Sequence, residues 1–340
     1  MPTSAERSAH RLGVVLIGCA ALCLASDGVL VKLSLRAGAS TATAVIAKMA
    51  VAALGLTVVL AVLARAAPPA ADGRTGLARL VPSWSGAAHI AGVAVMTAIV
   101  QLGFTLGFWL TKAANVLAFT SLAPIWGSVL ARVALDEPLR ARTLLASALA
   151  LAGALVVAAG FSHAPTGAGG APNVAVGAIC LATGIAQAGQ LVVIKSSITR
   201  APGTEMLVGA VLGFALATLV GFALVPPLQP ADVPLMPPAR ALVWLFLDGA
   251  GMAGALTFIT LAGTRISPPE GALVLQLEAL LGPILCFLVL REAPSTCTVA
   301  GGLIVVVAVC GHETASLLAD SRQREPDDAV AGRTSPLLRM

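Results

Sequence analysis

Charged and aromatic residues are both scarce in this chain, and each shortage excludes a class of protein. Asp, Glu, Lys and Arg make up 11% of the 340 residues, whereas hydrophobic residues make up 58%. A soluble protein needs more polar side chains than this to cover its surface. Aromatic residues account for 4% and Tyr is absent, which argues against a membrane β-barrel with its aromatic girdles. The composition predicts an all-α polytopic membrane protein.

The sequence also lacks the motifs of known catalytic and metal centres. It contains no HExxH, GxSxG or P-loop pattern, and its six cysteines include no CxxC. Its four histidines, His10, His89, His163 and His312, are scattered along the chain. We therefore expect no catalytic residues, no cofactor and no metal, although an intramembrane enzyme stays open as a remote alternative. The net charge of +5 is spread between apolar segments rather than gathered in a patch, so we expect no nucleic-acid partner.

The long apolar segments predict membrane-spanning helices. About 20 apolar residues are needed to cross the hydrocarbon core of a bilayer. By this criterion we expect ten transmembrane helices, over residues 12–35, 41–64, 86–109, 113–132, 142–161, 173–195, 204–226, 240–262, 269–290 and 296–316.

The Lys and Arg residues predict the orientation of these helices. With the N-terminus inside, 15 of the 21 basic residues fall on the cytoplasmic side, 5 fall outside, and Lys48 lies within a span. Cytoplasmic loops carry an excess of positive charge, so we expect both termini in the cytoplasm. The Ala-rich composition favours a bacterial inner (plasma) membrane.

The two halves of the sequence are related. A shift of 155 residues aligns five identical pairs: Leu122 with Leu277, Gly127 with Gly282, Leu130 with Leu285, Leu135 with Leu290, and Glu137 with Glu292. Earlier in each half, KLSLRAG from Lys32 is similar to KSSITRAPG from Lys195. Five spans per half is an odd number, so the second half has the opposite orientation. This predicts a five-plus-five inverted repeat with a site between the halves near the bilayer midplane.

The repeat divides the chain into three predicted parts. Residues 1–172 form the first repeat of five helices, and residues 173–317 form the second. Residues 318–340 carry mixed charges, Pro326 and Pro336, without an apolar period. We expect that last segment to be a disordered cytoplasmic tail.

Each half also carries a proline or glutamate in an apolar helix, an acidic turn, and a glycine in the next helix. These residues are Pro124, Asp136–Glu137–Pro138 and Gly153 in the first half, and Glu278–Ala279, Arg291–Glu292 and Gly301–Gly302 in the second. The pattern resembles the EamA-type carriers of the drug/metabolite transporter superfamily, over about residues 12–316. The resemblance implies ten helices in an inverted repeat. It also implies transport of amino acids, drugs, sugars, nucleotide-linked sugars or other metabolites, without naming the cargo.

Four ionisable residues are predicted within the membrane, where an unpaired charge is costly. Asp27 and Lys48 lie at equal depth, roughly 12–14 Å below the outer surface, so we expect an ion pair. It acts either as a gate that breaks during transport or as a static link between two helices. Glu278 lies near the bilayer centre, where a carboxyl group can exchange a proton or bind a cationic substrate. Asp248 opens the Gly-rich stretch DGAGMAGAL, whose glycines permit close helix packing.

Neutral polar residues complete the predicted substrate site. The candidates for substrate binding are Gln101, Asn115, Gln187, Gln190, Gln276 and Trp126. Hydrogen bonds between helices are the alternative role for the amides.

These observations together predict a secondary active transporter that works by alternating access. It moves a small metabolite, amino acid or drug, by efflux and with proton coupling, and it acts as a monomer or homodimer in the lipid bilayer. The alternative is a nucleotide-sugar or organophosphate exchanger. Such anions need several cations in the cavity, and Lys48 alone lies deep within a span.

Overall fold

The structure of the chain is a computed structural model that describes residues 4–66, 80, 82–110, 120, 122–137, 141–160, 173–224, 236–291 and 296–322. All the regular structure in these residues is helical, which confirms the predicted all-α class. Asn115, one of the predicted site residues, lies outside the described residues, as do residues 323–340.

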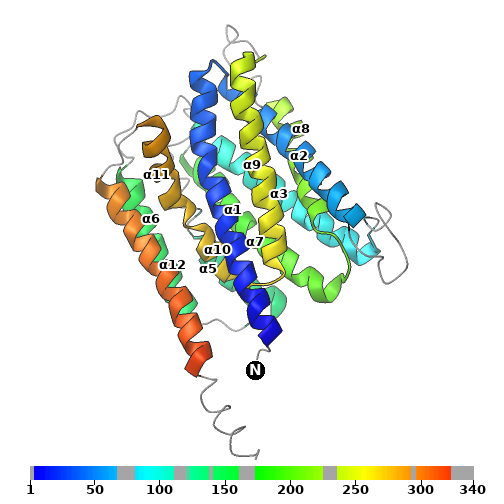
Figure 1. Cartoon of the computed structure of the whole chain (residues 1–340), viewed down its shortest axis with the longest axis vertical. Helices are drawn as coiled ribbons and strands as arrows, with labels where there is room; N and C mark the ends of the chain where they lie inside the picture. The colour runs from blue at the N-terminus through cyan, green and yellow to red at the C-terminus, as the bar shows by residue number, and fades with distance from the viewer. Residues whose placement is uncertain are drawn as a thin grey trace, which may run out of the picture.

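Eleven helices account for most of the described residues, and Figure 1 shows them as one elongated bundle. Their bounds are α1 Ser4–Arg36, α2 Thr41–Ala66, α3 Trp84–Leu110, α5 Ala123–Leu135, α6 Ala141–Gly160, α7 Asn173–Arg200, α8 Leu207–Leu224, α9 Ala239–Gly263, α10 Pro268–Leu275, α11 Glu278–Leu290 and α12 Thr296–Arg322. Each of the ten predicted ranges overlaps a helix. The range 269–290 differs in form, because it is broken into α10 and α11.

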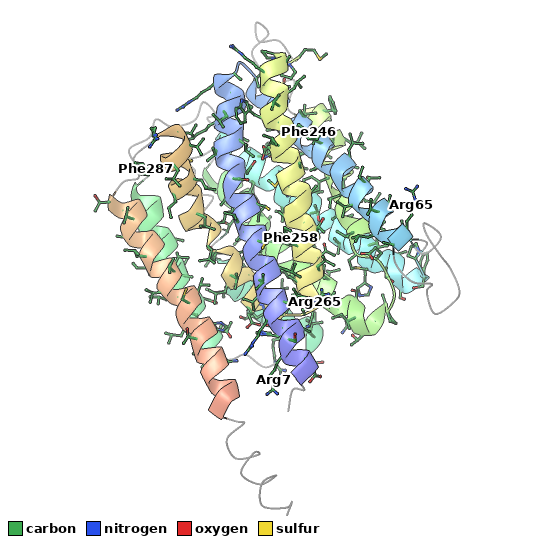
Figure 2. The ribbon with its side chains drawn as sticks, in the orientation of Figure 1. Arg7, Arg65, Phe246, Phe258, Arg265 and Phe287 are labelled. Carbon is green, nitrogen blue, oxygen red and sulfur yellow. The ribbon has the colours of Figure 1, made fainter. Side chains whose placement is uncertain are left out.

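Several of these helices are suited to a lipid environment. Among the described residues, five helices are long and apolar enough to cross a membrane: Glu6–Arg36, Thr43–Ala66, Trp84–Gly107, Gly177–Arg200 and Ala239–Gly263. Four shorter apolar helices accompany them: Ala123–Leu135, Ala141–Val156, Leu207–Ala223 and Val299–His312. Large apolar side chains cover the outside of the bundle (Figure 2), with Val133 78% and Leu145 72% exposed. Apolar surface of this extent is costly in water, so the structure indicates a membrane protein.

The main helix contacts join the first half of the sequence to the second. α1 packs on α9 and α11, α2 on α8 and α9, and α3 on α7 and α8. α5 packs on α7 and α10, and α6 pairs with α12 along one edge of the bundle (Figure 1). The buried core accordingly mixes side chains of both halves, such as Ile17, Met49, Phe214 and Leu273. The two halves therefore share one core instead of forming separate units.

Helix ends of the two halves have matching backbone geometry. Asp136 after α5 and Arg291 after α11 both adopt a left-handed conformation, with φ of 55° and 59°. They stand 155 residues apart, which is the shift found in the sequence. Gly38 after α1 and Gly203 after α7 also have positive φ, 96° and 77°, and both end the related segments that begin at Lys32 and Lys195. Glycine suits this region because it has no Cβ.

The break between α10 and α11 is a single tight turn. The backbone N–H of Gln276 donates to the oxygen of Leu273 at 3.0 Å, and that of Leu277 donates to Val274 at 3.1 Å. These bonds span three residues instead of four, as in a 3₁₀ turn. α11 then begins at Glu278, so this carboxyl group lies at a helix N-terminus inside the bundle.

The last helix is longer than the sequence predicts. α12 continues to Arg322, so the first residues of the predicted tail, 318–322, are helical. Leu317, Leu318 and Ala319 favour helix, and they extend α12 beyond its apolar segment.

Candidate functional site

A cavity of about 600 Å³ lies among helices of both halves of the chain. α1, α2 and α3 from the first half line it, together with α7, α9, α10 and α11 from the second. Its polar lining consists of Asp27, Lys32, Lys48, Gln101, Thr105, Gln187, Gln190 and Glu278. Apolar side chains such as Phe104, Met252 and Leu256 form much of the remaining wall. A few polar groups on an apolar wall are typical of sites for small molecules.

The helices of the first half line the cavity toward one end of the bundle. α1 lines it with residues from Leu24 to Lys32, α2 from Ala44 to Lys48, and α3 from Val100 to Thr105. These segments lie toward the C-terminal end of α1, at the top of Figure 1. The N-terminal half of α1 contributes no residue to the lining. The cavity thus extends from the middle of the bundle toward this end.

Lys48 and Asp27 form the ion pair expected from their equal depth. Lys48 Nζ donates a hydrogen bond to Asp27 Oδ1 at 2.6 Å, linking α2 to α1. The Lys48 residue is only 8% exposed. The attraction between the two buried charges offsets the cost of removing both groups from water. Removing either partner would leave the other as an unpaired buried charge.

Asp248 lies behind this pair and belongs to the same group of charges. It is 1% exposed and interacts electrostatically with both Asp27 and Lys48. Its Oδ2 atom is buried without a hydrogen-bond partner among the described residues. Two neighbouring carboxylates repel each other, and the positive charge of Lys48 offsets this repulsion. Asp248 therefore belongs to one electrostatically coupled group with Asp27 and Lys48.

Gly249 allows Asp248 to reach this position. A Cβ atom at Gly249 would lie 2.5 Å from Val51 Cβ and 2.7 Å from the backbone oxygen of Lys48. α9 and α2 therefore approach too closely here for any side chain. The neighbouring Gly251 differs, since its nearest atom would be Ser26 Oγ at 3.7 Å, an ordinary contact. Of these two glycines, only Gly249 is required by the packing.

Glu278 is the second carboxyl group in the cavity wall. It is the first residue of α11 and faces the charges of Asp27 and Lys48. We refer to the four interacting residues, Asp27, Lys48, Asp248 and Glu278, as the cavity cluster.

Three of the predicted amides line the cavity beside this cluster. Gln101, Gln187 and Gln190 come from α3 and α7. Gln190 Nε2 donates to Thr97 Oγ1 at 2.9 Å, so it also links the two helices. Gln187 Oε1 is buried and has no partner in the described part of the chain. This oxygen can accept a hydrogen bond from a bound molecule.

Two further predicted site residues lie elsewhere. Gln276 Nε2 donates to the backbone oxygen of Thr120 at 3.4 Å and does not line the cavity. Trp126 packs against the hydrophobic core from α5, also outside the lining. The structure therefore brings together six of the ten predicted residues in the wall, with Asp248 directly behind them.

Two polar lining residues were not among the predicted site residues. Thr105 follows Gln101 by four residues on α3, and Lys32 follows Gly28 by four residues on α1. Residues at this spacing share a helix face. Extending the predicted polar positions by one helical turn would have identified Thr105.

Comparison with known proteins supports the fold but names no function. The chain matches no protein-family model and no curated protein. One solved structure, described only as "Crystal structure of protein", is similar with a TM-score of 0.65 over 91% of this chain and 98% of that chain. The two sequences are 18% identical, so the likeness is one of fold alone.

Proposed function

We propose that this chain is a secondary active transporter that moves a small metabolite, amino acid or drug across a membrane by alternating access. The observation that carries the proposal is the cavity of about 600 Å³ between the sequence halves, with the cavity cluster in and behind its wall. Ionisable groups at membrane depth are expected in substrate and proton pathways. A site that both sequence halves line is also what alternating access requires.

The proposed architecture is ten membrane-spanning helices in a five-plus-five inverted repeat, with both termini in the cytoplasm. The contact pattern supports it. In the proposed repeat, α1 corresponds to α7, α2 to α8, and α3 to α9. Exchanging each helix for its equivalent turns the contact of α1 with α9 into that of α7 with α3, and both contacts are present. The same exchange turns the contact of α2 with α9 into that of α8 with α3. The left-handed residues Asp136 and Arg291, 155 residues apart, support the same relation.

Membership of the EamA-type carriers of the drug/metabolite transporter superfamily is part of the proposal. It is supported by the acidic turn at Asp136–Glu137 and by Gly153 of α6, where α6 packs closely on α12. A Cβ atom at Gly153 would lie 2.7 Å from the backbone oxygen of Gly301. The two motif glycines therefore meet at one helix crossing.

In the proposed orientation the cavity faces the outside of a bacterial inner membrane. The N-terminus of α1 is then cytoplasmic, and the cavity lies toward the opposite end of α1. We expect the cavity cluster to take up a proton from this side and release it inside as cargo moves outward.

The charges in the wall favour some cargoes over others. Lys32 and Lys48 line the cavity, but so do Asp27 and Glu278, and Lys48 is already paired. An organophosphate or nucleotide-sugar needs a surplus of positive charge. The balance here favours a molecule that carries a positive group, alone or beside a negative one. The apolar wall, with Phe104 and Met252, suits its hydrocarbon part.

A ligand screen on the purified protein in detergent tests the proposal. Amino acids, polyamines, nucleotides, sugar phosphates and cationic drugs are compared for the rise that each produces in the melting temperature. A ligand present at about 100 times its Kd stabilises the folded state by about 2.7 kcal/mol. We expect a hit among the amino acids or organic cations, and flux of that ligand in proteoliposomes driven by a pH gradient. Binding without any flux would contradict the transporter assignment.

A further inference from the structure

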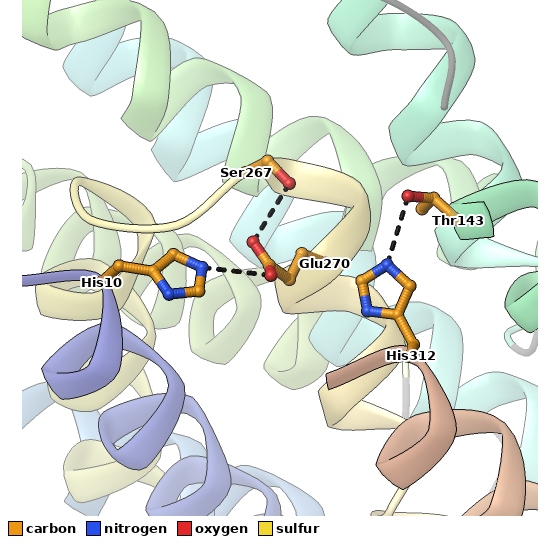
Figure 3. A network of polar contacts seen from close by, with 5 residues as sticks. All are labelled: His10, Thr143, Ser267, Glu270 and His312. Carbon is orange, nitrogen blue, oxygen red and sulfur yellow. Dashed lines mark hydrogen bonds and ion pairs between the residues drawn. The ribbon is translucent and has the colours of Figure 1, made fainter. Parts of the chain in front are cut away.

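A second polar network lies at the end of the bundle away from the cavity. His10 on α1 contacts Glu270 on α10, with 3.1 Å between His10 Nε2 and Glu270 Oε1. Ser267 Oγ donates to the other carboxylate oxygen of Glu270 at 3.4 Å. Figure 3 shows this chain of contacts crossing from α1 to the start of α10. The contact therefore joins the first half of the sequence to the second.

The bundle is closed where this contact lies. One turn after His10, a Cβ atom at Gly13 would lie 2.6 Å from Ile266 Cγ2 and 2.9 Å from Arg265 Cβ. α1 thus presses directly on the turn between α9 and α10. The cavity begins only at Leu24 on the same helix. An opening of the cavity toward this end between α1 and α10 has to break this contact.

Other charged and titratable groups surround Glu270. His312 on α12 lies on the far side of the carboxylate from His10 (Figure 3) and acts on its charge. Lys195 on α7 also acts on Glu270, and Glu137 at the end of α5 acts on Lys195. α9 ends next to Arg265, whose Nη1 donates to the backbone oxygen of Leu261 on its own helix. From α6, the neutral Thr143 Oγ1 contacts His312 Nε2 at 3.2 Å.

The two histidines differ in their access to water. The side chain of His10 is 33% exposed, whereas His312 is 6% exposed and is bound to Thr143. Histidine is the side chain that changes charge near physiological pH. His10 can exchange protons with the solvent at this end of the bundle, and it directly contacts the carboxylate that bridges the halves.

We propose that the contact between His10 and Glu270 is a proton-operated latch that holds the two halves of the chain together at the end opposite the cavity. When His10 is protonated, the contact is an ion pair, which is stronger than a hydrogen bond between neutral groups. When His10 is neutral, the contact weakens and α1 separates from α10 more readily. The inference rests on the proposed function, since a latch needs a molecule that opens at alternate ends. In the proposed orientation, cytoplasmic acid keeps the inner end closed.

Thiol labelling at Ala21 tests the latch. Ala21 is fully buried and lies on the face of α1 that carries His10, between that residue and Leu24. The full chain, with its six cysteines replaced by Ala and with Ala21→Cys introduced, is placed in lipid nanodiscs. The rate of labelling by a water-soluble maleimide is measured at about pH 5.5 and about pH 8, on either side of the usual histidine transition. Variants are compared at equal pH, which cancels the change in thiol reactivity.

The expected result is specific to one histidine. At the lower pH, we expect His10→Gln and Glu270→Gln to label about fivefold faster than the parent, the difference between a charged and a neutral hydrogen bond. At the higher pH, His10→Gln and the parent label alike. His312→Gln is the control and follows the parent at both values. Size-exclusion chromatography checks that each variant is folded.

Two outcomes would overturn the latch. One is equal labelling of His10→Gln and the parent at the lower pH. The other is a pH dependence of the labelling rate that persists in His10→Gln and disappears in His312→Gln. The labelling needs no cargo, so its failure is separate from failure of the ligand screen. If a ligand binds but the labelling rate does not depend on His10, the latch is wrong and the transporter proposal still stands.

Discussion

The two charged regions of this molecule are built differently. In the cavity cluster, the three carboxyl groups of Asp27, Asp248 and Glu278 act on a single lysine, Lys48. At the opposite end, Glu270 is surrounded by His10, His312 and Lys195. The first region has surplus carboxyl groups beside a cavity, whereas the second has one carboxylate held among basic groups at a closed helix junction. Surplus carboxyl groups therefore lie where a ligand or proton can enter, and a carboxylate enclosed by basic groups lies where the bundle is sealed.

The sharpest test of this comparison replaces one glutamate in each region. We expect Glu278→Gln to lose the whole rise in melting temperature caused by a cavity ligand, and to reduce coupled flux to background. Glu270→Gln should keep the ligand-induced rise, because Glu270 does not line the cavity. Thermal unfolding of both variants with and without ligand is the measurement. Equal losses in the two variants would remove the distinction between the regions.

The ion pair of the cavity cluster gives the next largest effect. Lys48→Met leaves buried carboxyl groups without their cation, and we expect a loss of about 3 kcal/mol of stability. Asp27→Asn should also destabilise, and the double variant should lose less than the sum of the two. Unfolding in detergent of the two single variants and the double variant gives the coupling energy. Additive losses would show that the 2.6 Å contact does not couple the two groups energetically.

The close approach of α9 to α2 should be sensitive to one methyl group. We expect Gly249→Ala to destabilise the protein by about 1–3 kcal/mol, since its Cβ would overlap Val51 and the backbone of Lys48. Gly251→Ala, two residues later on the same helix, is the matched control and should be neutral or slightly stabilising. Thermal unfolding separates the two variants. A similar loss in both would mean that glycine content alone matters, whatever the packing around each position.

The smallest expected effect concerns the amide that links α7 to α3. The hydrogen bond from Gln190 to Thr97 measures 2.9 Å, and such bonds between membrane helices contribute about 0.6 kcal/mol on average. A double-mutant cycle with Gln190→Leu and Thr97→Val should give a coupling of this size. A coupling of several kcal/mol would place this bond in the same class as the ion pair of Lys48.

The class of the fold and the approximate place of each helix could be predicted from the sequence. Long apolar segments are a strong signal, because each one has the length that a helix needs to cross a bilayer. The equal depth of Asp27 and Lys48 likewise predicted their pairing, because depth along a helix follows directly from residue number. The interruption before Glu278 was harder to predict, since the hydrogen bonds of Gln276 and Leu277 leave no mark in hydropathy.

The contact between His10 and Glu270 could not be predicted in the same way. The two residues are 260 positions apart, and each reads as an ordinary residue near a helix end. Nothing in their local sequence indicates that α1 lies against the start of α10. Trp126, a predicted substrate-binding residue, packs against the hydrophobic core from α5 and is not part of the cavity lining.

The sequence by itself thus determined that this chain forms apolar helices, how deep each charged residue lies within them, and which residues recur in the two halves. These properties depend on residue type and on distance along the chain. Tertiary structure decided which faces meet. It placed Asp248 behind Asp27 through the close approach at Gly249, and it set His10 against Glu270 at the sealed end. In helices that are apolar on every side, hydropathy does not specify a partner, so the pairing depends on the shape of the packed side chains.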